Sequence, residues 1–208
     1  MKGLLIKDIL VLRKSIKTSL PIIIFAAVYS YATDSPAYML GMITLIFTMM
    51  PITSMTCDDM SKWDRYALTM PISRRDIVVS KYILSILLST VSIIVSTTIT
   101  YIFIVLPKDN MDRKDLLLAA YLIFFISLVY VSIMLPLIYK FGVERTRILF
   151  IAVLAIPGIL IYILYKGNLQ MPSEEQLLFL LKISPFMLII ILFISAFVSN
   201  IIYKNKDI

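Results

Sequence analysis

Long apolar segments alternate with short clusters of charged residues along the whole chain. All but the first segment approach or exceed the roughly 20 residues that an α-helix needs to cross a bilayer. The pattern predicts six transmembrane helices over about residues 19–32, 38–57, 81–106, 116–139, 148–165 and 183–203. We therefore expect an all-α integral membrane protein whose single transmembrane domain spans residues 1–208.

The N-terminal residues 2–18 have a different, amphipathic pattern. Leu5, Ile9, Leu12 and Ile16 share one helical face, and the lysines lie on the opposite side. A basic amphipathic helix of this kind lies on the surface of an anionic leaflet, so we expect an elbow helix here. The alternative is a simple extension of the first span.

The distribution of basic residues predicts the orientation. Six spans place both termini on one side of the membrane, and fifteen of the twenty Lys and Arg residues then fall on that side. Cytoplasmic loops carry such an excess of positive charge, so we expect both termini to be cytoplasmic.

Composition agrees with a membrane protein and excludes several other classes. The chain is 60% hydrophobic and 16% charged, with a mean hydropathy of +0.94, whereas soluble domains are about 45–50% apolar. Its net charge of +7 is explained by membrane orientation rather than by a nucleic-acid partner. The single cysteine forms no intramolecular disulfide, and the absence of histidine removes the commonest general base and zinc ligand.

The stretch 58–82 is the polar centre of the chain. Met60, Trp63, Ala67 and Met70 fall on one face of a predicted helix, which Pro71 ends. Ser73 and Asp76 then form a capping box, so a new helix begins there and continues into the third span. Such a unit can act as a lever moved by a partner protein. A helix that lies on the lipid surface without any partner is an equal alternative.

Two sets of hydroxyl residues follow helical faces of adjacent spans. They are Thr44 and Thr48 in the second span, and Ser85, Ser89, Ser92 and Ser96 in the third. Small hydroxyl residues mostly let membrane helices pack closely, which is the default interpretation. The alternative is a wall of a substrate path, because the methionines around the threonines suit an amphipathic and variable cargo.

The loop sequence KWDRYALTMPISRRDIVVSKY over 62–82 resembles the corresponding loop of ABC-2 type transporter permeases. It is most similar to the small six-span permeases of phenol-soluble-modulin and bacteriocin-type peptide exporters. The resemblance implies a coupling helix over Asp58–Met70, within a coupling loop 58–76, that docks on an ATPase subunit. By match, the coupling residues are Asp58, Asp59, Met60, Trp63, Arg65, Tyr66 and Met70.

The resemblance also implies a function: the permease subunit of an ATP-driven exporter in a bacterial cell membrane. The implied cargo is an amphipathic or hydrophobic peptide, or a similar lipophilic compound. No G-x-x-x-x-G-K-[ST] motif occurs here, so we expect no catalysis or cofactor in this chain, and ATP with Mg²⁺ in a separate ATPase. A second permease chain, identical or related, completes the expected complex.

Three other functions are the alternatives. An ion-coupled carrier is disfavoured because no charged residue lies deep inside an expected span. An intramembrane enzyme lacks histidine, a buried carboxylate pair and a nucleophile elbow. A non-transport scaffold or immunity protein is compatible with the sequence.

Overall fold

The computed structural model describes residues 2–33, 35–105, 113–166 and 174–206, and every regular element in those ranges is an α-helix. The helices are α1 (Lys2–Ala32), α2 (Pro36–Met60), α3 (Trp63–Ala67), α4 (Arg74–Val105), α5 (Arg113–Phe141), α6 (Val143–Lys166) and α7 (Glu174–Lys204). The expected all-α class is confirmed for these residues.

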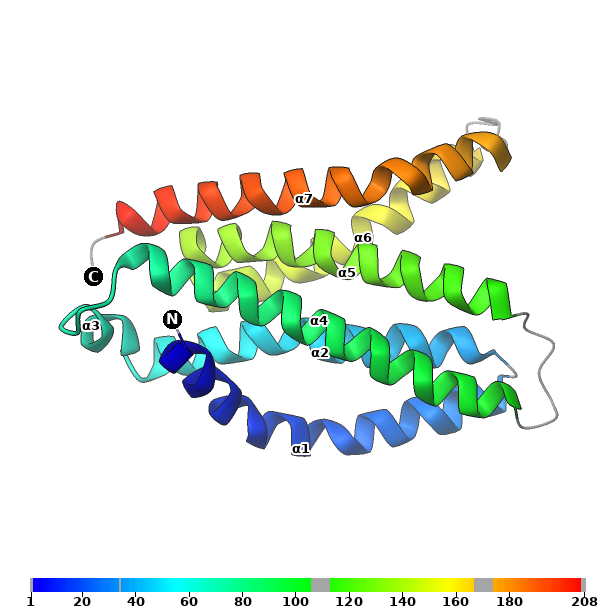
Figure 1. Cartoon of the computed structure of the whole chain (residues 1–208), viewed down its shortest axis with the longest axis horizontal. Coiled ribbons are helices and arrows are strands. Elements are labelled where there is room, and N and C mark those ends of the chain that lie inside the picture. The colour runs from blue at the N-terminus through cyan, green and yellow to red at the C-terminus, as the bar shows by residue number, and fades with distance from the viewer. Residues whose placement is uncertain (1, 34, 106–112, 167–173, 207–208) are drawn as a thin grey trace.

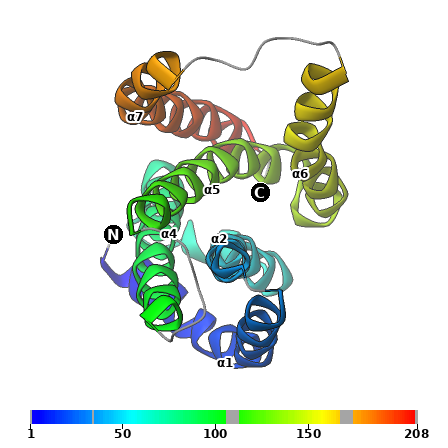
Figure 2. The ribbon, with the colours of Figure 1, turned by 90° about the vertical axis from the view of Figure 1, so that its right-hand side faces the viewer.

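The long helices run alongside one another, and the short helix α3 lies at one end of the bundle (Figure 1). The N-terminal end of α1 and the C-terminal end of α7 lie at that same end, which we call the loop end. Seen along the bundle, α4 and α5 separate α1 from α7 (Figure 2). This places the polar loop beside both termini.

Four helices in the described part of the chain are long and apolar enough to cross a membrane. Their candidate spans are Ala37–Met60, Arg74–Ile102, Lys114–Phe141 and Leu181–Lys204. The uncharged part of α1, residues 18–32, is shorter than the roughly 20 residues of a full crossing. The count of six spans therefore stays a prediction.

The N-terminal segment differs from the expected elbow helix. It is the first part of α1, which continues without interruption into the expected first span. Ile9, expected on the apolar face, is 46% exposed, whereas Leu4, Asp8 and Leu12 are buried. These three residues are one helical turn apart, so they form a single stripe that faces the bundle.

The capping box expected at the start of α4 is confirmed. The Ser73 hydroxyl oxygen accepts a hydrogen bond from the main-chain N–H of Asp76 at 3.1 Å. In return, the Asp76 carboxylate accepts one from the main-chain N–H of Ser73 at 3.2 Å. The two bonds are reciprocal and cap the first turn of the helix, which fixes where the loop ends and α4 begins.

Two clusters of buried apolar side chains hold the bundle together. The one at the loop end contains residues of α1, α2, α3, α4, α5 and α7, together with Val143, the first residue of α6. Its members include Leu4, Met55, Ala67, Ile77, Tyr139, Val143 and Tyr203. The other joins α1, α2 and α4 further along the bundle, through Leu12, Met39, Ile43, Phe47, Met50, Leu84 and Leu88. Because Ala67 is fully buried in the first cluster, α3 is packed onto the bundle.

Candidate functional site

The loop between α2 and α4 is not the single helix over Asp58–Met70 that the sequence predicts. Asp58, Asp59 and Met60 form the last turn of α2, and Met70 follows the end of α3. Lys62 adopts a left-handed backbone conformation with φ 50°, which a right-handed helix cannot contain. The expected helix is therefore wrong, and a five-residue helix stands in its place.

Trp63 at the start of α3 makes its contacts inside the chain. The Lys7 ammonium lies 4.5 Å from the centre of the indole ring, a distance at which a cation is attracted to the ring face. The Tyr66 ring is 5.6 Å away, and Trp63 packs against the apolar cluster at the loop end. The Trp63 ring thus attaches α3 to α1.

Four of the predicted coupling residues are exposed at the loop end. Met60 is 81% exposed and Tyr66 60%, and Asp59 and Arg65 are also exposed. Their side chains are accessible to a partner, whereas the Trp63 side chain is only partly exposed.

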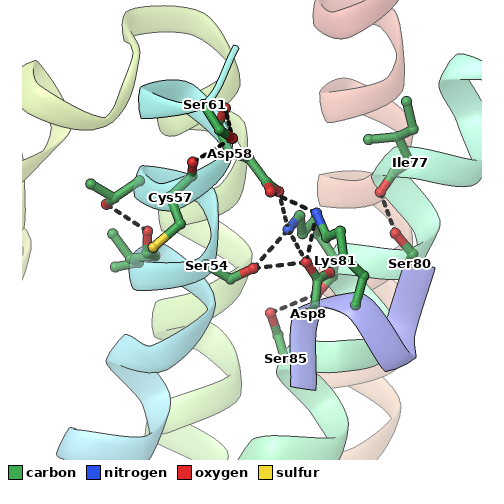
Figure 3. A network of polar contacts seen from close by, with 12 residues as sticks. Asp8, Ser54, Cys57, Asp58, Ser61, Ile77, Ser80, Lys81 and Ser85 are labelled. Atoms are coloured by element: carbon green, nitrogen blue, oxygen red, sulfur yellow. Dashed lines mark hydrogen bonds and ion pairs between the residues drawn. The ribbon is translucent and has the colours of Figure 1, made fainter. Parts of the chain in front are cut away.

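Four charged side chains from three helices form what we call the ion network: Lys7, Asp8, Asp58 and Lys81. Figure 3 shows Asp8, Asp58 and Lys81 converging at this point. The Lys81 ammonium lies 2.8 Å from Asp8 and 2.6 Å from Asp58. The Lys7 ammonium lies 2.6 Å from Asp58 and 3.0 Å from Asp8. The network therefore connects α1, α2 and α4 at one point.

Ser54 completes the network with its hydroxyl. It donates a hydrogen bond to Asp8 at 2.9 Å and accepts one from Lys81 at 2.9 Å. The side chains of Asp8 and Lys81 are only 1% and 4% exposed, and buried charges are tolerated only when they are paired and hydrogen-bonded. Two lysines opposite two aspartates meet that condition.

Asp8 stays ionised although it is buried. Burial by itself raises the pKa of its carboxyl, but the Lys81 ammonium, with a smaller contribution from Lys7, lowers that pKa to below its ordinary value. Within the described residues, no three acidic or cysteine side chains are arranged to hold a metal ion. The carboxylates of the network are instead neutralised by lysines.

Sequence reasoning misses the ion network. It places Asp8 on a helix facing lipid, and Lys81 at the first position of a span. A signal was present, because Asp8 lies one turn after Leu4 and one turn before Leu12. An acidic residue inside an apolar stripe requires a buried cation or a polar partner.

A second contact between the loop and the bundle is made by Arg74, the first residue of α4. Its guanidinium donates to the main-chain carbonyls of Tyr203, Lys204 and Lys206 at 2.6–3.1 Å. The last carbonyls of a helix have no partners within the helix, and a basic side chain satisfies them. The start of α4 is thereby fixed to the end of α7.

The serine stripe of α4 lies within the bundle. Its four predicted members are all fully buried: Ser85, Ser89, Ser92 and Ser96. The Ser96 and Thr44 hydroxyls are 3.5 Å apart, so the stripe faces α2. Ser92 donates to the carbonyl of Ser89 in its own helix, as a small hydroxyl residue at a helix contact commonly does.

The two threonines of α2 line an apolar groove of about 200 Å³. Its other lining residues are Gly41, Leu45, Met49, Ile123, Ile126, Ser127, Tyr130 and Phe150, which come from α2, α5 and α6. Thr44 and Thr48 donate their hydroxyl protons to carbonyls of α2 itself. Their polar groups are thus satisfied, and the groove is suited to a hydrophobic occupant.

A family model described as ABC-2 family transporter protein matches residues 3–204 of the chain. The match covers the loop end, the ion network and the groove. No curated protein matches the chain significantly.

Proposed function

The chain belongs to the ABC-2 family of transporter proteins, and from this premise we propose that it is the membrane-spanning permease subunit of an ATP-driven exporter. A separate subunit binds and hydrolyses the ATP, because this sequence contains no phosphate-binding loop. In this proposal the loop end faces the cytoplasm and carries the ATPase.

The observation that best supports the proposal is the way α3 is presented. Its inner side is fixed to the bundle by Ala67, which is fully buried. On its outer side, Arg65 and Tyr66 are exposed, next to the exposed Met60 at the end of α2. Tyrosine and arginine are residue types that dominate the binding energy of protein interfaces. This surface is our proposed ATPase contact.

The cargo that we propose is an amphipathic or hydrophobic peptide. The support is the groove between α2, α5 and α6, which has a volume of about 200 Å³ and is lined mainly by apolar side chains, as hydrophobic binding sites are. Met49 contributes a flexible side chain that can adapt to different cargo residues. A second permease chain, identical or related, would face this one across the path.

The serine stripe fits a helix seam better than a cargo path. Its four members have no exposed surface, so cargo could reach them only if α2 and α4 separated. We therefore assign cargo contact to the groove side of α2.

An ion-coupled carrier is the second candidate, because the structure buries a carboxylate, that of Asp8, which such carriers use. However, Lys81 and Lys7 keep Asp8 ionised, and a proton carrier needs a carboxyl that can take up a proton. The ion network is thus better suited to holding helices together than to carrying protons.

The test is reconstitution of the chain in proteoliposomes together with the P-loop ATPase encoded nearest to it. We expect a stable complex whose ATP hydrolysis is stimulated by an amphipathic helical peptide, and ATP-dependent transport of that peptide. A complex with an ATPase variant that cannot hydrolyse ATP is the control. Transport driven by a proton gradient without ATP would replace the proposal with the ion-coupled carrier, and failure to bind the ATPase would refute it.

A further inference from the structure

The ion network is continuous with α3. The Trp63 ring contacts the Lys7 ammonium, Lys7 pairs with Asp58, and Asp58 pairs with Lys81. Each step joins a different pair of helices, from α3 to α1, then to α2, and then to α4. A series of direct contacts thus leads from the surface helix into the bundle.

α3 is attached to this network in two ways. One attachment is the contact of Trp63 with Lys7, at 4.5 Å. The other is covalent, because Asp58 lies five residues before Trp63 in the same stretch of chain. A displacement of α3 therefore acts on Lys7 twice, through the Trp63 ring and through Asp58 at the end of α2.

The buried charges resist being separated. If Lys7 left the network, Asp8 and Asp58 would share the single ammonium of Lys81 in a site where Asp8 is 1% exposed. An unbalanced charge at such low exposure is strongly unfavourable. It is therefore easier for α1 to follow α3 than for Lys7 to leave the two aspartates.

We propose that Lys7 is a positioning residue that makes α3, α1 and α4 move as one unit, through its contacts with Trp63, Asp58 and Asp8. This inference deepens the proposed function and rests on it in one respect: the ATPase supplies the displacement of α3. Lys7 itself touches neither ATP nor cargo. Its role is to transmit a movement at the loop end to the helices of the bundle.

The first experiment uses the isolated chain in detergent, with Trp63 as reporter, because it is the only tryptophan. The decisive variant is the double substitution Asp8→Asn with Lys81→Met. It removes one charge of each sign, so the remaining Lys7 and Asp58 stay balanced and the protein keeps its fold. The matched control is Lys14→Gln, on the same helix at an exposed position.

We expect the double variant to shift Trp63 emission to longer wavelength and to increase its quenching by acrylamide. Within the network, Asp8 and Lys81 contact Lys7, Asp58 and Ser54, so such a change reaches Trp63 through Lys7 or Asp58. The single substitution Lys81→Arg, which keeps the charge, should give the wild-type emission, and so should Lys14→Gln. Wild-type emission and quenching in a correctly folded double variant would overturn the proposal.

The second experiment measures peptide transported per ATP hydrolysed in the reconstituted complex. For Lys7→Gln we expect this ratio to fall about fivefold or more, the lower part of the range for coupling between distant sites, while Lys14→Gln keeps the wild-type ratio. An unchanged ratio for Lys7→Gln would also overturn the proposal. If the wild-type chain binds no ATPase at all, the proposed function fails, and Trp63 emission in the isolated chain alone decides the role of the network.

Discussion

The ammonium of Lys81 lies 2.8 Å from the carboxylate of Asp8, although 73 residues separate the two along the chain. Asp8 belongs to α1 and Lys81 to α4, and both side chains are almost completely buried. This pair joins the N-terminal helix to the helix that begins directly after the polar loop. It also makes a clear prediction about stability.

Lys81→Met should destabilise the folded chain strongly. Breaking a buried ion pair by removing one partner costs about 3–5 kcal/mol, because the other charge is left buried without compensation. Adding Asp8→Asn to the same variant should recover most of that loss, since the remaining charges are balanced. Thermal unfolding in detergent measures both effects. Equal unfolding temperatures for the single and the double variant would contradict the pairing.

The same pair predicts a loss of stability in acid. The pKa of Asp8 is lower in the folded chain than its ordinary value, so the unfolded chain binds the proton more readily. The stabilisation is fully present above the unfolded pKa of about 4 and is lost as the pH falls through the folded pKa. Between neutral and acidic pH, the unfolding temperature should fall more for the wild type than for the Asp8→Asn, Lys81→Met double variant. An equal fall in both would contradict this assignment.

How much the sequence predicts depends on how local each feature is. The capping box of Ser73 and Asp76 involves residues three positions apart, so its pattern is visible in the sequence and the structure confirms it. The end of α2 is set by the left-handed conformation of Lys62, which is uncommon for lysine. The pattern of apolar residues does not reveal this break, so it predicts a loop helix that is longer than α3.

The candidate site was predictable in part for the same reason. The loop-end location of Tyr66 follows from the loop sequence alone. The contact between Asp8 and Lys81 depends on which helices become neighbours, and no local pattern contains that information. Likewise, helical periodicity finds the hydroxyl faces of α2 and α4, but only the packing of the bundle distinguishes the buried Ser92 from the groove-lining Thr48.

Tyr66→Ala should weaken binding of the ATPase without affecting the fold. Tyr66 is 60% exposed, so its removal takes little from the core, whereas a tyrosine anchored in an interface contributes about 2 kcal/mol or more. Trp63→Ala should weaken binding and also lower the unfolding temperature, because Trp63 packs against the apolar cluster. Co-purification beside thermal unfolding separates the two. Undiminished ATPase binding by Tyr66→Ala would remove α3 from the proposed contact.

Lys2, Lys62 and Lys204 should all be cytoplasmic. Lys2 begins α1, Lys62 lies between α2 and α3, and Lys204 ends α7. These three segments lie at the loop end of the bundle (Figure 1). The positions Asn110 and Asn168, which lie outside the described residues, are predicted on the opposite side of the membrane. Single cysteines at these positions, in a Cys57→Ser background, can be labelled in intact cells with an impermeant maleimide. Labelling of position 62 from outside would reverse the orientation.

Substitution by leucine should have opposite effects on stability at Ser92, in the seam between α4 and α2, and at Gly41, on the groove side of α2. Ser92→Leu adds volume at a fully buried position in the seam between α4 and α2, and overpacking of this kind costs about 1–3 kcal/mol. Gly41→Leu points into free space, because a Cβ at Gly41 meets no atom within 4 Å and the residue lines the groove. It should leave the unfolding temperature unchanged or raise it, since leucine favours a helix by about 1 kcal/mol over glycine.

If the groove carries the cargo, Gly41→Leu reduces peptide transport in a stable protein, whereas Ser92→Leu loses transport only in proportion to its stability. Full transport by Gly41→Leu would assign the cargo path to another surface of the bundle.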